Sequence, residues 1–330
     1  MYFTSLWFHS ATGTDRHAVP GCLMDTGKDL LTLMDFSSER IDKTLRLARD
    51  LKARRLCDEP QVLSRRTGVL LFEKPSLRTR ITFETGIHEL GGHPLNLEPH
   101  MVQLGKRETV ADVARNLDRW VHLIVARTYA HETLEELARR CSAPVVNALT
   151  DRFHPCQALA FALTVREHLS DEKHINTAFV GDGNNVCVSI MVVCARLGYS
   201  FILACPDGYA PPEETVEQCR RIASSTGSEI KIVREPREAV ANASIIYTDV
   251  WTSMGQEQEK SRREKAFASY QVNKNLLSEA PAEALVSHCL PAHRGEEITG
   301  EVLDSPRCIA FDEAENRLYV QKAVIVRIFT

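Results

Sequence analysis

The chain has 330 residues, with 40 Lys and Arg against 44 Asp and Glu, so its formal net charge is -4 at pH 7. At roughly 100–200 residues per domain, this length suggests two domains, and it can bury most of its apolar surface without disulfides. The near-neutral charge excludes a strongly basic nucleic-acid-binding protein. Since no apolar run approaches the roughly 20 residues that span a bilayer, no membrane association is expected.

The N-terminal segment is predicted to be an extension, residues 1–27, that precedes the first domain. Its first eight residues lack the basic region and the long apolar core of a signal peptide. Met24 is an alternative start of the chain.

The ten cysteines are scattered and form no C-x-x-C pair or zinc-like spacing. Most of them lie among apolar residues, which favours buried, reduced thiols in a cytoplasmic protein. Cys289 is the exception, because basic residues lie near it in the sequence.

The elements of the first half alternate between strands and helices. Apolar runs predict strands at 67–72, 121–126 and 144–147, and helical patterns cover 78–90 and 132–140. A helix at 154–169 is expected to link the two halves.

The second half repeats this alternation. Strands are predicted at 177–181, 200–204, 229–233, 243–248, 285–289 and 308–311, and helices at 186–197 and 212–225. The fold class is therefore α/β, with two domains that each hold a mostly parallel sheet flanked by helices, joined by interdomain helices. The predicted domains cover 28–153 and 154–315, and an amphipathic helix at 316–330 returns to the first domain.

Ligands of such sheets bind beyond the carboxyl ends of the strands, so the residues that follow each strand are the candidate site. After the strand at 67–72 come Ser76, Arg78 and Thr79, at the start of a helix. Free helical amides, hydroxyls and a guanidinium together suit a phosphate. Helix capping by Ser76 is the alternative interpretation.

Two further segments supply polar groups on the same side. Arg127 follows the strand at 121–126, and alone it could be a surface charge. His154 and Gln157, three residues apart at the start of the linking helix, share one face. Beside an anion site, His154 could donate to a carbonyl oxygen that becomes negative during a reaction.

The strand at 177–181 leads into a loop with Gly181, Gly183, Asn184 and Asn185. The third glycine of the dinucleotide-binding pattern is replaced by Val186, so that signal is weak. The two asparagines could bind an amino-acid backbone, or Asn184 could cap the helix.

Two later segments complete the candidate site. Asp249 follows a strand and offers an anionic partner for an amine, and residues 253–255 have the composition of a mobile turn. Cys289 could be a nucleophile, but a contact with the ligand is favoured because no His–Asp pair is placed around it.

Four of these segments, in this order, resemble the aspartate/ornithine carbamoyltransferase family: 76–80 (SLRTR), 154–157 (HPCQ), 249–255 (DVWTSMG) and 288–291 (HCLP). The SMG and HCLP segments are similar to the ornithine branch. The resemblance runs from about Lys28 to Phe329 and implies transfer of a carbamoyl group from carbamoyl phosphate to the side-chain amine of L-ornithine, in arginine biosynthesis or in reverse.

The resemblance also implies roles for individual residues, with Arg127, His154 and Cys289 at the reacting centre. The residues implied to bind carbamoyl phosphate are Ser76, Leu77, Arg78, Thr79, Gln103, Arg127, His154, Gln157 and Arg317. Those implied to bind ornithine are Asn185, Asp249, Ser253, Met254, Cys289 and Leu290. No metal or organic cofactor is expected, because phosphate is already a good leaving group.

Family members form trimers with shared active sites, which implies a homotrimer or a multiple of trimers in which Gln103 reaches the neighbour's phosphate site. Two residues depart from the family pattern. Leu77 stands where a threonine is usual, as in relatives that act on N-acylated ornithines, and Phe161 stands where aspartate is commoner.

Several alternatives stay open at this point. N-acetylornithine or putrescine could be the acceptor, although the segment 253–255 favours free ornithine. A dinucleotide-dependent oxidoreductase would rest on Gly181 and Gly183 alone, and a non-catalytic binding protein would not need Arg127 and His154. The aspartate branch would need cationic groups for a second carboxylate, whereas Asp249 suits an amine.

Overall fold

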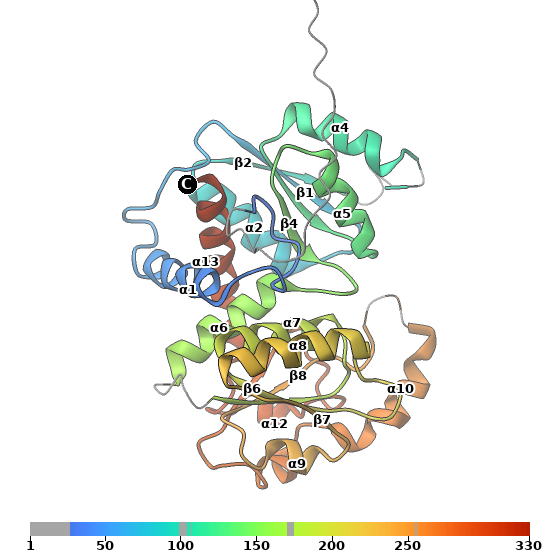
Figure 1. Ribbon diagram of the computed structural model, residues 1–330. Coiled ribbons are helices and arrows are strands. Elements are labelled where there is room, and N and C mark those ends of the chain that lie inside the picture. The colour runs from blue at the N-terminus through green and yellow to red at the C-terminus, as the bar shows by residue number, and fades with distance from the viewer. Residues whose placement is uncertain (1–26, 99–103, 106, 170–174, 254, 256) are drawn as a thin grey trace, which may run out of the picture.

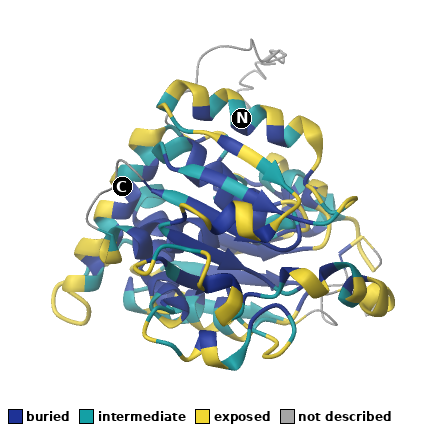
Figure 2. Cartoon of the chain, turned by 90° about the horizontal axis from the view of Figure 1, so that it is seen from below, coloured by how far each residue is buried: buried dark blue, intermediate teal, exposed yellow. Residues whose placement is uncertain are grey.

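The computed structural model describes residues 27–98, 104–105, 107–169, 175–253, 255 and 257–330. These residues form two halves, each built on one sheet in which every strand pair is parallel (Figure 1). The predicted α/β class is therefore confirmed. The strands lie inside and are mostly buried, while the outward faces of the surrounding helices are exposed (Figure 2).

The first sheet has four strands in the order β2-β1-β3-β4. Their bounds are Thr67–Phe72 for β1, His93–Leu97 for β2, Leu123–Arg127 for β3 and Val145–Leu149 for β4. Successive side chains of a strand point to opposite faces. Val69 and Leu71 accordingly pack with helices α4 (Val110–Trp120) and α5 (His131–Arg140), whereas Leu70 and Phe72 pack with α1 (Ser38–Ala53) and α2 (Leu77–Glu89).

The second sheet has five strands in the order β7-β6-β5-β8-β9. They are β5 (Asn176–Val180), β6 (Ser200–Ala204), β7 (Ile230–Val233), β8 (Ile245–Thr248) and β9 (Leu285–His288). Phe179 packs on one face with α7 (Asn185–Leu197) and α8 (Glu213–Thr226), and Ala178 and Val180 face the other side. Four short helices lie there: α9 (Pro236–Val240), α10 (Lys260–Phe267), α11 (Lys274–Leu277) and α12 (Gly300–Leu303).

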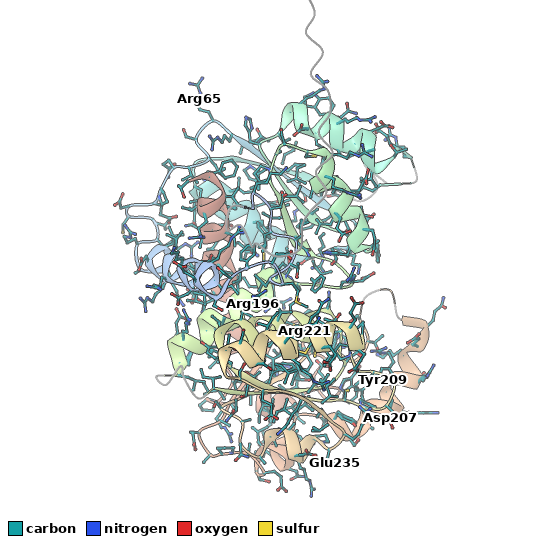
Figure 3. All side chains as sticks on the ribbon, viewed as in Figure 1. Arg65, Arg196, Asp207, Tyr209, Arg221 and Glu235 are labelled. Atoms are coloured by element: carbon teal, nitrogen blue, oxygen red, sulfur yellow. The ribbon has the colours of Figure 1, made fainter. Side chains whose placement is uncertain are left out.

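Two helices connect the halves. α6 (Pro155–His168) follows β4 and leads to β5, and α13 (Ala310–Phe329) leaves the second half and packs on α1, α2 and α6 (Figure 1). Arg196, at the end of α7, lies between the halves (Figure 3), where it donates to the carbonyl of Met34 and its own carbonyl accepts from Ser38 Oγ at 2.5 Å. The halves are thus held together on the side of these helices.

The strand predicted at 308–311 is wrong. Cys308 forms only an isolated bridge with Val286, and α13 begins at Ala310, six residues earlier than the predicted helix. Asp312 and Glu313 in its first turn suit a helix N-terminus, where the partial charge is positive. Strand β2 and helices α1, α4, α9, α10, α11 and α12 were not predicted.

Among the described residues, no helix is both long and apolar enough to cross a bilayer. The division of the chain at residue 153 stays a prediction, as does the extension before residue 28.

Candidate functional site

The carboxyl ends of the two sheets face a common cleft of about 1010 Å³. Most of the predicted site residues line it, although they come from segments far apart in the sequence. Those that line it are Ser76, Leu77, Arg78, Arg127, His154, Gln157, Asn185, Asp249, Ser253, Cys289, Leu290 and Arg317. Gln103 and Met254 lie outside the described residues.

The N-terminus of α2 forms one end of the cleft. Ser76 caps this helix, because its Oγ accepts a hydrogen bond from the Thr79 amide at 3.3 Å. The same residue also lines the cleft, so the capping role and the site role of Ser76 are compatible. Arg78 is half-buried, and burial lowers its pKa. Arg80 is not part of the site, because it is exposed and pairs with Glu84 at 2.9 Å.

Two buried arginines stand beside this helix end. Arg127 is 4% exposed, and burial, followed by repulsion from Arg317, lowers its pKa to about 10, so it remains a cation at neutral pH. Arg317 is 3% exposed, and its Nη2 donates to Thr79 Oγ1 at 2.6 Å. Thr79 is fully buried and is not part of the cleft wall, so its hydroxyl orients Arg317.

Each of these two arginines has a side-chain nitrogen that makes no hydrogen bond to the described residues and could donate to a ligand. Arg127 Nε and Arg317 Nε are buried and find no hydrogen-bond partner in the described part of the chain. Burying such groups unpaired is costly, so the pocket is suited to an anion that satisfies them.

His154 lies at the start of α6, where its backbone amide donates to Ser189 Oγ at 2.7 Å. Burial lowers the pKa of the imidazole well below 6.5, and Arg317 and Arg127 lower it further. His154 is therefore neutral at pH 7 and can donate from one ring nitrogen only.

The other wall of the cleft is built around Asp249. Its carboxylate accepts from Asn184 Nδ2 at 2.8 Å, from the Val250 amide at 2.7 Å and from Cys289 Sγ at 2.8 Å. Asn184 also caps α7, because its Oδ1 accepts from the amides of Val186 and Cys187. Asn185 Nδ2 donates to the Thr150 carbonyl at 2.5 Å, a bond that a substrate carboxylate would have to replace.

Cys289 is a protonated thiol rather than a thiolate. Burial raises its pKa well above 9, and the adjacent Asp249 raises it further. This environment disfavours the nucleophilic role and favours a contact role.

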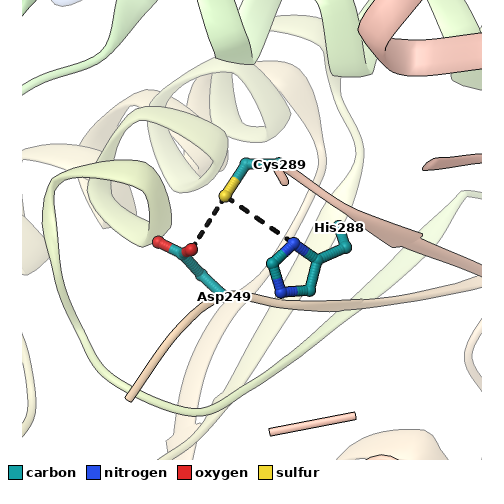
Figure 4. A group of neighbouring side chains, drawn as sticks. All are labelled: Asp249, His288 and Cys289. Carbon is teal, nitrogen blue, oxygen red and sulfur yellow. Dashed lines mark hydrogen bonds between the residues drawn. The ribbon is translucent and has the colours of Figure 1, made fainter. Parts of the chain in front are cut away.

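Asp249, His288 and Cys289 together could suggest a metal site (Figure 4). However, His288 Nδ1 accepts from the Leu290 amide at 2.8 Å, and its Nε2 lies 3.0 Å from Glu297 Oε1. Both ring nitrogens are thus engaged within the protein, and the Asp249 carboxylate already accepts three hydrogen bonds. These contacts instead hold Leu290, whose φ of 53° is unusual for a branched residue.

Gly183, just before α7, has a packing explanation. A Cβ on Gly183 would lie 2.5 Å from Pro211 Cδ and 2.6 Å from the Tyr209 carbonyl oxygen. Since Asn184 already uses two of the first helical amides, little remains there for a pyrophosphate. The structure therefore disfavours the dinucleotide interpretation.

Sequence reasoning missed two charged pairs in the cleft wall. Lys74 is buried, pairs with Asp151 and lies 4.3 Å from the centre of the Tyr129 ring. Arg263 on α10 pairs with Asp182 and lies 4.8 Å from the centre of the Tyr209 ring; Tyr209, labelled in Figure 3, also lines the cleft. Lys74 and Asp182 each lie two residues past the end of a strand, β1 and β5, so the rule that located Arg127 could have found them.

Phe161 has a clear structural place. It is fully buried, and its ring meets Tyr247 edge to face at 5.5 Å. An apolar residue therefore fills the core beneath the site where the family pattern more often has aspartate.

Sequence models of known families match nearly the whole described chain. Residues 28–167 match the aspartate/ornithine carbamoyltransferase carbamoyl-P binding domain, and residues 173–328 match the Asp/Orn binding domain.

Individual relatives agree with these matches. The ornithine carbamoyltransferase of Geobacillus stearothermophilus is 47% identical over 303 residues, which cover 92% of this chain and 97% of the relative. The solved ornithine carbamoyltransferase of Pyrococcus furiosus superposes with a TM-score of 0.88 at 43% identity, over 92% of this chain and 97% of that one. The anabolic enzyme of Campylobacter jejuni gives 0.87 at 37% identity, over 92% and 99%.

Proposed function

The chain belongs to the aspartate/ornithine carbamoyltransferase family, and we propose that it transfers the carbamoyl group of carbamoyl phosphate to the side-chain amine of L-ornithine. The products are L-citrulline and phosphate. One observation carries the choice of reaction: a cationic pocket of Arg78, Arg127 and Arg317 shares a cleft with the carboxylate of Asp249. The first suits a phosphorylated donor, and the second suits an acceptor that carries an amine.

The donor is proposed to bind at the end of α2. Its phosphate takes hydrogen bonds from the Ser76 hydroxyl, the first amides of α2 and Arg78, in the manner of helix N-terminal anion sites. Arg127 bridges the phosphate and the carbamoyl oxygen, and Arg317 adds a second buried cation. Leu77, which is 70% exposed, contributes its backbone amide but no hydroxyl.

The reaction is proposed to depend on fixed donors. When the amine attacks the carbonyl carbon, negative charge builds on the oxygen and on the departing phosphate. Arg127 and a neutral His154 donate to that oxygen, and such preorganised donors supply much of the catalysis in acyl transfer. The same cations disfavour an ammonium at the reacting carbon and so favour the neutral amine, whose ordinary pKa is about 10.

The acceptor is proposed to bind against the second sheet. Asp249 and Ser253 hold the α-amine, Asn185 and the Met254 backbone hold the carboxylate, and Cys289 and Leu290 line the side chain near the reacting end. The aspartate branch is disfavoured because Asp249 would repel a second carboxylate.

The biosynthetic direction is proposed on the relative from Campylobacter jejuni, which is named anabolic. A cytoplasmic location is proposed because each of the nine described cysteines is a free thiol.

A homotrimer or a multiple of trimers is also proposed. Leu77 and Ile81, one turn apart on α2, expose 70% and 52% of their surfaces beside the phosphate pocket. A neighbouring subunit that covers them would also bring its own Gln103 to the donor.

The test is a substrate panel with purified protein and carbamoyl phosphate. We expect citrulline and phosphate in equal amounts with L-ornithine, and little product with N-acetylornithine, putrescine or aspartate. A protein that carbamoylates one of the last three and not ornithine would refute the proposed acceptor.

A further inference from the structure

A buried carboxyl group lies directly behind the cleft. Glu313, in the first turn of α13, has no exposed surface. It accepts hydrogen bonds from Gln157 Nε2 at 2.5 Å, from the Tyr247 hydroxyl at 2.7 Å and from Ser287 Oγ at 2.6 Å. Three elements, α6, β8 and β9, therefore meet on one side chain that does not reach the cleft itself.

This contact fixes the orientation of the Gln157 amide. An ionised carboxylate can only accept hydrogen bonds, so the nitrogen of the amide must face it. The amide oxygen, Oε1, is buried and finds no partner among the described residues, although Gln157 lines the cleft. The side chain thus keeps one group for a ligand, and that group is an acceptor.

The donor substrate offers a matching group. On the proposed function, on which this step rests, the carbamoyl part of the donor lies beside Gln157 and carries an NH2. Acetyl phosphate has nearly the same shape but places a methyl group there. An NH2 satisfies the buried oxygen, whereas a methyl group leaves it unpaired, which costs binding free energy.

We propose that Glu313 is a positioning residue that holds the Gln157 amide with its oxygen toward the cleft, and that it thereby makes the enzyme prefer carbamoyl phosphate to acyl phosphates. Glu313 lies one turn before Arg317 on α13. This turn of α13 therefore places the guanidinium of Arg317 for the phosphate. Through Glu313 it also makes Gln157 present a hydrogen-bond acceptor to the carbamoyl end.

A carboxylate is the group best suited to this task. A glutamine at position 313 could donate as well as accept, so it would allow either orientation of Gln157. Burial raises the pKa of Glu313 to about 7, although its three hydrogen bonds oppose that rise, so the side chain is ionised at pH 8.

The test compares Glu313→Gln with wild type at pH 8, with Tyr247→Phe as the matched control. The measurements are the KM for carbamoyl phosphate, the inhibition constant of acetyl phosphate and the KM for ornithine. In Glu313→Gln we expect the preference for carbamoyl over acetyl phosphate to fall about tenfold, the effect of one hydrogen bond, while the KM for ornithine stays unchanged. Tyr247→Phe removes another donor to Glu313 but leaves Gln157 held, so it should keep the preference.

A double variant tests whether the effect passes through Gln157. Gln157→Met has no amide to orient, so adding Glu313→Gln should lower the preference no further. Should Glu313→Gln fail to fold, Glu313→Asp replaces it, because its shorter carboxyl withdraws from the amide.

An unchanged preference in the folded variant, or an equal loss in Tyr247→Phe, would overturn this role for Glu313. A wild-type protein that makes no citrulline would instead contradict the proposed function, and this inference with it. A wild-type protein that binds acetyl phosphate as tightly as carbamoyl phosphate would contradict this inference alone.

Discussion

At the scale of single residues, the site is governed by how burial changes charge. Arg127 stays a cation although it is buried beside Arg317, whereas His154 and Cys289 are held neutral. The cleft therefore offers fixed positive charge at one end and neutral donors next to it. Such an arrangement stabilises developing negative charge without a proton transfer to the protein.

Replacing Arg127 tests the cationic donor. Arg127→Ala should raise the barrier to turnover by about 3 kcal/mol, as loss of an oxyanion donor does, which is a rate loss of roughly a hundredfold. Because the change also removes repulsion with Arg317, we expect the free energy of unfolding to stay level or rise. Steady-state kinetics and urea unfolding would measure the two effects.

The control for this prediction is Arg115→Ala. Arg115 is exposed and pairs with Asp112 at 3.1 Å on α4, so its removal should leave turnover unchanged. Near-normal turnover in Arg127→Ala would contradict the role of Arg127.

The thiol of Cys289 is predicted to be unreactive. The nucleophile in alkylation is the thiolate, and burial together with Asp249 raises the pKa of this thiol well above 9. At pH 8, iodoacetamide should therefore modify the exposed Cys57 at least about tenfold faster than Cys289. Cys289→Ser should keep much of the turnover, because a hydroxyl can still donate to Asp249.

Peptide mass spectrometry over a time course would measure both alkylation rates in one sample. Faster labelling of Cys289 than of Cys57, together with an inactive Cys289→Ser variant, would indicate a nucleophile instead of a contact residue.

At the scale of elements, helix ends organise the cleft. The ends of α2, α6 and α7 each place a side chain in it: Ser76, His154 and Asn184. α13 contributes in another way, because it returns from the second half to the first and carries Glu313, Arg317 and Lys322 along its length. Its placement therefore affects both the site and the stability of the first half.

Lys322 gives a stability prediction for α13. It is fully buried and donates to Glu59 and, at 2.7 Å, to Glu89. Lys322→Met leaves the carboxylate of Glu59 without its cation and leaves Glu89 with Arg55 alone, so it should lower the free energy of unfolding by about 3 kcal/mol at pH 7. Lys43→Met is the control, because Lys43 forms an exposed pair with Glu39 that is worth less than about 1 kcal/mol.

The loss should depend on pH in a defined direction. Burial opposes ionisation of Glu89, but hydrogen bonds from Lys322 and Arg55 outweigh it and lower the pKa below the usual 4.5. A lowered pKa contributes stability above 4.5 that disappears as the pH falls through the folded-state value. The difference between wild type and Lys322→Met should thus shrink from pH 7 to below about 4 in urea unfolding; a constant difference would show that the pairing is not its cause.

The elements differ in how well the sequence predicts them. Buried parallel strands such as β1 and β6 are short apolar runs between turn residues, so their signal is local. β2 lies at an edge of its sheet with exposed and half-buried residues, including Pro94, and has no such signal. The apolar stretch at 308–311 has the pattern of a strand because, over only four residues, a buried helix N-terminus and a buried strand have the same composition.

The site shows the same division. Residues at the carboxyl ends of strands, such as Arg127 at the end of β3 and Asp249 directly after β8, could be found from the order of elements. Glu313 could not be found in this way, because its role depends on Gln157, Tyr247 and Ser287, which lie 26 to 156 residues away in the chain. Only packing brings these four side chains together.

At the scale of the whole molecule, the net charge of -4 does not reveal that cations and a carboxylate line one cleft. Arg78, Arg127 and Arg317 line the same cleft as Asp249, whereas Asp182 is already paired with Arg263. The three arginines therefore attract an anionic donor, and Asp249 attracts an acceptor that carries an amine, within one cleft. This field acts within the cleft and needs no excess charge on the protein as a whole.

The proposed sharing of sites between subunits gives a prediction for the assembly. Arg127 acts in its own subunit's cleft, whereas Gln103 is proposed to act in the neighbour's. Arg127→Ala and Gln103→Ala proteins should each be nearly inactive alone. If the two are unfolded, mixed in equal amounts and refolded, some clefts will receive Arg127 from one chain and Gln103 from the other, and random assembly makes this about a quarter of all sites. Citrulline formation should then recover to about that fraction of wild type, with light scattering confirming a trimer or its multiple.

Arg127→Ala mixed with Arg127→Ala/Gln103→Ala is the control, since no arrangement of those chains supplies an intact Arg127. No recovery in the first mixture, although mixed trimers form, would show that each site is built within a single chain. Recovery in the control would show that activity does not need Arg127.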